Sequence, residues 1–172
     1  ERMGWMNFRM RAMCATFLTI NCGISWHHGA QHFMNCLVDG DLAINNWQWQ
    51  MQSGITNPLS DTFRIYNPTK NIQDRDPELN FVYHWIEELR GYTLPEILAA
   101  DYINNSYYPE PIVDWSQTRK VNGKIVSNLR KKVKERLLSE KGEEYYNATA
   151  TKRTVEKYRE SKDRQYREAN AK

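Results

Sequence analysis

Apolar side chains recur at three- and four-residue spacing through most of this chain, and no segment shows the two-residue alternation of a strand. Residues 5–20 follow that spacing without Gly or Pro, which predicts one buried helix. Ser25 favours the start of a second helix that ends near Gly40. A third, more polar helix is expected over residues 42–52. The pattern therefore predicts an all-α fold.

Gly, Pro and other turn residues interrupt the second half of the chain more often. Residues 53–75 are rich in Gly, Pro, Asn and Asp, which is typical of a long ordered loop. Asp76 and Pro77 predict a helix start, and that helix is expected to reach Gly91. A short helix is predicted from near Thr93. On a later, basic helix, one apolar stripe is expected from Val126, Leu129, Val133 and Leu137.

These elements suggest a division into a helical domain (1–115), a basic amphipathic helix (116–141) and a charged, helical or partly disordered tail (142–172). The length of 172 residues suits about one domain. No apolar run reaches the roughly 20 residues of a membrane helix, and no targeting segment precedes residue 5, so the start resembles a cut end. We expect a soluble, intracellular protein, with the compartment, an organelle included, left open.

Charge changes the picture of possible partners. Residues 1–114 carry seven Lys and Arg against thirteen Asp and Glu, a net charge of −6, whereas residues 115–138 carry eight against one, a net charge of +7. Nucleic-acid binding requires a basic face that neutralises phosphates. DNA is therefore a weakly supported partner for the acidic body.

The thiols and imidazoles do not match a known metal motif. Cys14, Cys22 and Cys36 are odd in number and lack paired short spacing, which favours buried, reduced thiols in a reducing compartment. His28 and His32 are four residues apart, as in helical zinc hydrolases, but no Glu lies between them. We therefore assign no metal ligands and disfavour a metal hydrolase.

Residues 39–49 crowd two carboxylates, two Asn amides and two indoles between helices whose other faces are predicted to be buried. Buried polar groups need partners, so one interpretation is a ligand site or functional network. The other is a surface helix end with Asp caps. The residues alone leave both open.

Six segments in order, across residues 3–115, resemble the FAD-binding helical domain of DNA photolyases and cryptochromes. The segments are 4–11, 25–34, 39–49, 63–68, 85–89 and 108–113. The resemblance implies the C-terminal portion of that domain, followed by a C-terminal helical extension. It also implies FAD as the cofactor.

Position by position, the resemblance implies that Arg11 and Asp39 pair beside the flavin ring, where each lone buried charge would be costly. Asp41 would lie near the polar edge of the flavin. Asn45 would face the flavin N5, where an amide can both donate and accept hydrogen bonds.

The resemblance also implies roles for the indoles. Trp47 and Trp26 would be the first two members of an electron-hopping chain to the flavin, although Trp26 could equally be an ordinary core aromatic. Trp49, Arg9 and Arg64 would contact a flipped lesion and its phosphates. For Arg64, a solvated loop cation is the alternative.

Several departures from the family pattern stand beside this likeness. Family chains are much longer, and the portion without a counterpart here carries the helices that bind the FAD phosphates, so this chain would hold an incomplete pocket. Phe8 and Ala12 stand where lesion-repairing relatives usually carry Asn and Met, and a Gly-rich insertion before Trp47 is absent. These differences count against DNA repair by this chain alone.

Two functions are compatible with these observations. The first is a fragment or split piece of a blue-light flavoprotein. The alternative is a truncated relative without catalysis that serves as a subunit or scaffold. In either case, another protein chain or a larger assembly would cover the open half-pocket.

Overall fold

The computed structural model describes residues 2–56, 63–104, 107–149 and 160, with side chains up to 139 and at 160. These residues form helices and no strand, so the predicted all-α class is confirmed. The elements are α1 (Phe8–Thr16), the π-helical turn η1 (Phe17–Asn21), α2 (Trp26–Cys36), α3 (Leu42–Gln52), α4 (Pro68–Arg75), α5 (Asn80–Trp85), the 3-10 turn η2 (Glu87–Leu89), α6 (Leu94–Ala99) and α7 (Trp115–Thr149). Most of the predicted tail, from 150 onward except 160, lies outside the described residues.

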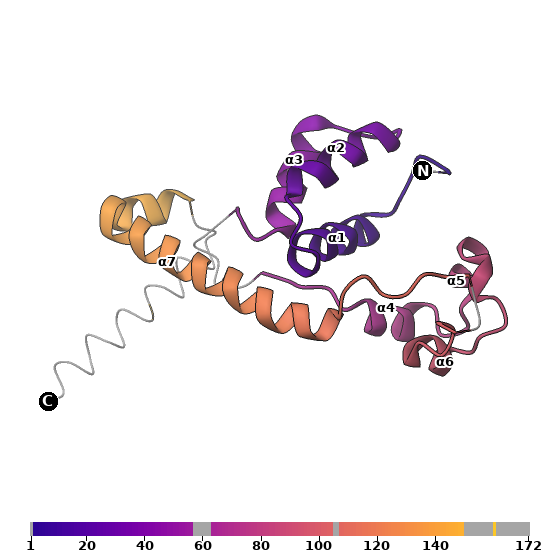
Figure 1. Cartoon of the computed structure of the whole chain (residues 1–172). Coiled ribbons are helices and arrows are strands. Elements are labelled where there is room, and N and C mark those ends of the chain that lie inside the picture. The colour runs from indigo at the N-terminus through magenta and orange to yellow at the C-terminus, as the bar shows by residue number, and fades with distance from the viewer. Residues whose placement is uncertain (1, 57–62, 105–106, 150–159, 161–172) are drawn as a thin grey trace, which may run out of the picture.

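The helices gather in two lobes (Figure 1). The first lobe contains α1, η1, α2 and α3. One buried cluster in it consists of Ala15, Ala30 and Trp49, and Ala12 and Ile20 are buried as well. The second lobe contains α4, α5, η2 and α6, and its buried core consists of Leu79, Val82, Leu89 and Tyr102. Helix α7 lies along the first lobe, and its C-terminal end extends beyond it.

Helix α1 begins later than the apolar pattern predicted. The chain turns at Gly4, whose φ is 65°, and the Asn7 side chain then accepts a hydrogen bond of 3.0 Å from the Met10 amide. This cap fixes the first helical residue as Phe8, so the predicted start at Trp5 was wrong.

Helix α2 begins after Ser25 as expected, but it ends before Gly40. Leu37 adopts an extended conformation, so the helix ends at Cys36 and the following residues form the turn that leads into α3. Helix α3 then covers 42–52, the predicted segment, because Asp41 caps its first turn through a 2.8 Å hydrogen bond from the Ile44 amide.

The segment 53–75, predicted as loop throughout, contains α4. Asn67 accepts a hydrogen bond of 3.1 Å from the Lys70 amide, and Pro68 occupies the first helical position. An N-cap residue followed by Pro is a helix-start signal. The prediction missed it because the rest of the segment is so rich in turn residues.

The predicted helix from Asp76 to Gly91 is broken in two. Leu79 has a left-handed φ of 58°, so α5 starts only at Asn80, and it ends at Trp85 before the short turn η2. Asp76 still caps the helix, because its carboxylate accepts hydrogen bonds from the amides of Phe81 and Val82 at 3.1 and 3.0 Å. The left-handed backbone conformation of Leu79 places its side chain in the core, where it is 2% exposed.

Helix α7 is held on the first lobe by side-chain to backbone contacts. Asn122 donates a hydrogen bond of 2.8 Å to the Ile20 carbonyl, and Arg130 donates to the carbonyls of Gly54 and Thr56. The predicted apolar stripe does not all face the body, since Leu129 and Val133 are exposed.

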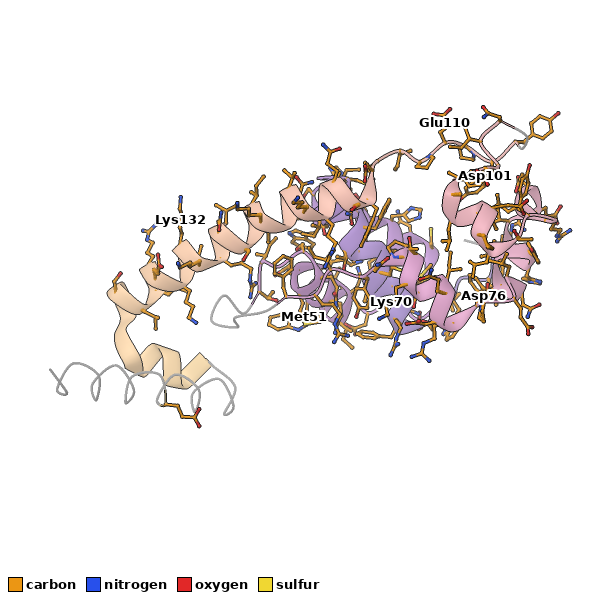
Figure 2. All side chains as sticks on the ribbon, turned by 90° about the horizontal axis from the view of Figure 1, so that it is seen from below. Met51, Lys70, Asp76, Asp101, Glu110 and Lys132 are labelled. Carbon is orange, nitrogen blue, oxygen red and sulfur yellow. The ribbon has the colours of Figure 1, made fainter. Side chains whose placement is uncertain are left out.

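The charges are distributed as the sequence predicted. Figure 2 shows the acidic side chains Asp76, Asp101 and Glu110 at one end of the molecule and Lys132 on α7 toward the other. Among the described helices, none is both long and apolar enough to cross a bilayer.

Candidate functional site

A cavity of about 270 Å³ opens between α1, α3 and the turn that joins α2 to α3. Its apolar walls are Phe8, Ala12, Ala15, Phe33, Leu37, Ile44 and Trp49. Its polar side chains are Arg11, Asp39, Asp41, Asn45, Gln48 and Gln52. The structure thus brings all four residues predicted to contact the cofactor into one site.

Arg11 and Asp39 are paired at the edge of the cavity. One terminal nitrogen of Arg11 donates to both carboxylate oxygens of Asp39, at 2.9 and 2.8 Å, and Nε of Arg11 donates to the Met6 carbonyl at 2.6 Å. The hydrogen bond from Arg11 lowers the pKa of Asp39 below its ordinary value. The side chains of Arg11 and Asp39 are 24% and 47% exposed. The pair was expected to be buried, and within this chain it is not.

Asn45 is held in a fixed orientation. Its side-chain nitrogen donates a hydrogen bond of 2.9 Å to the Ala30 carbonyl of α2. This contact uses one of the two N–H groups of the amide, and the amide oxygen can still accept hydrogen bonds. Asp41, which also lines the cavity, has one carboxylate oxygen engaged in capping α3.

Gln48 was not predicted as a site residue. It follows Asn45 by three positions and precedes Gln52 by four, so these three amides lie on one face of α3. The side-chain oxygen of Gln48 is buried and has no hydrogen-bond partner among the described residues. A buried acceptor left unpaired costs about 1–3 kcal/mol, so this oxygen favours a ligand that donates to it. Counting helical turns from Asn45 could have identified it.

Trp49 forms a wall of the cavity and is only 3% exposed. It lies one helical turn after Asn45, and its ring meets that of Phe33 edge to face at a centroid distance of 5.0 Å. Gly29 makes room for it, because a Cβ atom at that position would lie 2.1 Å from the indole. The site therefore needs a glycine beneath Trp49.

Trp47 lies on a different side of α3. Two residues advance a helix by about 200°, so Trp47 and Asn45 cannot share a face, and Trp47 is 54% exposed. Trp26 packs against the core cluster that contains Trp49, and it stacks on His27 at a centroid distance of 3.8 Å. Neither Trp47 nor Trp26 lines the cavity.

Of the three residues predicted to contact DNA, only Trp49 lines the cavity. Arg9 and Arg64 are exposed and lie outside the lining of the cavity, whereas Trp49 is buried in it. Arg64 lies over the ring of Tyr66 at 5.7 Å. Their roles at a lesion stay predictions.

Comparison with known proteins identifies the fold. A family model described as the FAD binding domain of DNA photolyase matches residues 1–128. The chain belongs to this family. The resemblance inferred from the six sequence segments is thereby confirmed.

Its photolyase and cryptochrome relatives are much longer. The deoxyribodipyrimidine photo-lyase of Vibrio cholerae is 37% identical over 135 residues, which cover 76% of this chain and 28% of that protein. A photolyase of Sulfolobus tokodaii, whose crystal structure contains two FAD molecules, superimposes with a TM-score of 0.65 at 33% identity, over 73% of this chain and 29% of that one. A Synechocystis cryptochrome gives a TM-score of 0.63 at 33% identity, over 71% and 27% of the two chains. The chain thus spans less than a third of the length of these relatives.

The residues of the cavity fit part of a flavin. Ligand pockets usually measure about 300–1,000 Å³, so a cavity of about 270 Å³ suits a ring system rather than a whole dinucleotide. Arg11 is the only Lys or Arg among the lining residues, and Asp39 neutralises it, so the pyrophosphate would find no free cation there. The residues that line this cavity therefore fit the ring system of FAD better than its phosphates.

Proposed function

We propose that this chain forms the ring-binding wall of an FAD site in a blue-light flavoprotein of the photolyase and cryptochrome type. One observation carries the proposal: the Arg11–Asp39 pair, the anchored amide of Asn45 and the unpartnered oxygen of Gln48 surround a single cavity. Membership of the FAD-binding family supports it.

Each polar group has a distinct task in this proposal. Arg11 and Asp39 together present a pair with little net charge, which suits a ring that changes its charge on reduction. The side-chain oxygens of Asn45 and Gln48 would accept hydrogen bonds from N–H groups of the ring. Three independent elements thus orient one planar ligand.

When bound, the flavin supplies a light-excited electron acceptor. The geometry favours Trp49 over Trp47 as the indole that donates to it, because Trp49 lines the cavity and Trp47 faces away. Trp26 packs against the core cluster that contains Trp49, so it is the indole placed to supply an electron to Trp49 once Trp49 had been oxidised. This order differs from the one that the family resemblance implied, because Trp49, and not Trp47, lies one helical turn after Asn45 on α3.

We further propose that additional polypeptide of the flavin domain covers the cavity. Large apolar side chains stand exposed on the elements around its mouth: Trp5, Phe8, Val38, Leu42 and Ile44 are between 58% and 82% exposed. An apolar surface of this kind requires cover in a folded protein. The same cover would shield the Arg11–Asp39 pair from solvent and supply cations for the pyrophosphate.

Co-expression with the N-terminal remainder of a photolyase relative tests the proposal. The purified complex should contain bound flavin, measured by its visible absorbance. Asn45→Ala and Gln48→Leu should each lower the flavin content, while Asn46→Ala, next to Asn45 but outside the cavity lining, should leave it unchanged. A stable complex without flavin would contradict the proposal and support the scaffold function.

Photoreduction of the same complex separates the two indoles. Trp49→Phe should slow flavin photoreduction more than Trp47→Phe does, at equal flavin content. The reverse order would show that Trp47 reaches the cofactor despite facing away from the cavity in this structure.

A further inference from the structure

A row of exposed aliphatic side chains runs along α7, outside the lining of the flavin cavity. Val121, Ile125, Leu129 and Val133 are between 46% and 56% exposed, and they follow one another at four-residue spacing. Residues four apart are neighbours on a helix surface, so these side chains form one continuous ridge, about 18 Å long at 1.5 Å per residue. We refer to these four residues as the α7 ridge.

The α7 ridge lies beside the face that attaches α7 to the first lobe. Asn122 and Arg130 donate the hydrogen bonds to that lobe, and each follows a ridge residue by one position, which is about 100° around the helix. Attachment therefore leaves the ridge open, and the C-terminal end of α7 extends beyond the lobe (Figure 1). A contiguous apolar row on a surface marks an interaction site, whereas scattered single residues do not.

Exposed cations border the ridge. Lys124 follows Val121 by three positions and Lys132 follows Leu129 by three, so each lies next to a ridge residue on the helix surface. Lys132 is labelled in Figure 2. Residues 115–138 as a whole carry eight Lys and Arg against one Glu. A complementary partner therefore presents an apolar strip flanked by carboxylates.

No described segment of this chain supplies such a strip over the full length of the ridge. The second lobe is acidic, but its helices α4, α5 and α6 contain 8, 6 and 6 residues, so the longest measures about 12 Å. The α7 helix of a second copy carries the same positive charge and would be repelled. Residues 139–172 carry nine Lys and Arg against seven Asp and Glu, so they lack the opposite charge.

Two other kinds of polyanion fit this surface less well. The phosphates of DNA would pair with the lysines and leave the aliphatic side chains uncovered. An anionic membrane would repel the body of the chain, because residues 1–114 carry seven Lys and Arg against thirteen Asp and Glu. The ridge also lacks the Trp or Phe side chains with which many interfacial helices insert into lipid.

We propose that the α7 ridge docks an acidic amphipathic helix of a partner protein. A row of side chains at four-residue spacing packs into the groove of a facing helix, which is the commonest helix-to-helix geometry in globular proteins. Carboxylates beside the apolar strip of the partner pair with Lys124 and Lys132 and fix its register. The inference does not depend on the proposed flavin function, because no ridge residue lines the cavity.

Fluorescence anisotropy with the full chain tests the proposal. The probe is a labelled helical peptide of about five turns, with Leu along one face, Glu on both sides of that face and Ala elsewhere. A reference peptide has the same composition in an order that forms no apolar face. The first peptide should bind about tenfold more tightly than the second, and its affinity should fall as salt is added.

A double variant of the ridge separates apolar packing from charge. Ile125→Gln with Leu129→Gln should weaken binding of the first peptide about tenfold, because Gln favours a helix but is polar. Ser127→Ala is the control, since Ser127 is exposed on another side of α7. It should leave the affinity unchanged, and helical circular dichroism should verify that both proteins are folded.

A second double variant tests the bordering cations. Lys124→Gln with Lys132→Gln should weaken binding less than the ridge variant does and should reduce the dependence of the affinity on salt. Lys70→Gln removes an exposed cation from α4 and should change neither quantity.

Several results would overturn the proposal. Equal affinity for the two peptides would show that charge alone attracts them. Tighter binding to phosphatidylserine vesicles, or to duplex DNA, would assign α7 to a membrane or to nucleic acid. A dimer detected by sedimentation that Ile125→Gln with Leu129→Gln dissociates would make a second copy the occupant. Loss of peptide binding after assembly with the N-terminal remainder of a photolyase relative would show that the flavin domain itself covers the ridge.

Discussion

The two lobes differ in what surrounds their buried apolar side chains. In the second lobe, Leu79, Val82, Leu89 and Tyr102 are each at most 7% exposed, and partly buried hydrophobic side chains surround them. The buried apolar side chains of the first lobe, Ala12, Ala15, Ile20, Ala30 and Trp49, lie beside an open cavity and a rim of exposed apolar side chains.

This difference separates stability from function. The second lobe has a closed core of its own, whereas the first lobe leaves polar groups and apolar surface ready for a ligand and further polypeptide. The lobe with the open cavity is the one that contains the residues predicted to contact the cofactor. A cofactor site requires a cavity in the protein, and a cavity lowers the free energy of unfolding because its walls lose packing contacts. The first lobe contains such a cavity.

The largest effect is expected from Leu79→Ala. Removing this side chain from the closed core should lower the free energy of unfolding by about 2–5 kcal/mol. Hydrogen exchange should accelerate in α5 and α6 and stay nearly unchanged in α2 and α3. Phe81→Ala, at a position that is 54% exposed, is the control and should have a much smaller effect. Equal acceleration in both lobes would show that they unfold as one unit.

Arg130→Met should release α7 from the first lobe. Burial lowers the pKa of Arg130, whose guanidinium donates to the carbonyls of Gly54 and Thr56. Hydrogen bonds from a charged group contribute about 1.5–3 kcal/mol each, so hydrogen exchange around 122–130 should accelerate clearly. Lys131→Met, whose side chain is 77% exposed in the wild type, should leave that exchange unchanged.

Gly29→Ala tests how tightly the first lobe packs around its indole. The added methyl group would collide with Trp49 and with Leu18, so the free energy of unfolding should fall by about 1–3 kcal/mol. The smaller ring of Trp49→Phe should relieve the collision in the double variant. Strict additivity of the two single effects, measured by urea unfolding, would show that the two positions are not in contact.

The smallest effect concerns two carboxylates, one in each lobe. Hydrogen bonds from Arg11 lower the pKa of Asp39, and hydrogen bonds from Thr93 lower the pKa of Glu96. Each carboxylate therefore stabilises the fold above its ordinary pKa, and this contribution disappears as the pH falls through the lowered value. NMR titration should show that salt raises the pKa of Asp39 more than that of Glu96, because only Asp39 has a charged partner. Equal sensitivity to salt would contradict this distinction.

The sequence predicted most helices because local signals decide where they begin. Asp41 and Thr93 each precede a helix that starts where expected, and Asn67 with Pro68 carried a further signal that was overlooked. The break at Leu79 was not predictable from local preference, since the pull of the core on that side chain imposes a backbone conformation that leucine disfavours.

The residues of the site were predicted only in part. Family resemblance pointed to Arg11, Asp39, Asp41 and Asn45, and the structure brings them to one cavity. The resemblance did not show that Trp47 and Trp49 lie on different faces of α3, and it did not point to Gln48. Motif likeness identifies residue types in order, whereas the face on which each lies depends on the number of residues between them.

The contact between η1 and α7 affects which substitutions the protein can accept during evolution. Asn21 reaches Thr118, and Asn122 reaches the carbonyl of Ile20, across 97 and 102 positions of chain. The dependence runs one way: Thr118 also donates to the carbonyls of Asp114 and Trp115, whereas Asn21 is 3% exposed and without Thr118 would retain only the longer contact to the Trp115 carbonyl. In the descent of this protein, a substitution at Asn21 should therefore have been accepted before one at Thr118, and rarely in the opposite order.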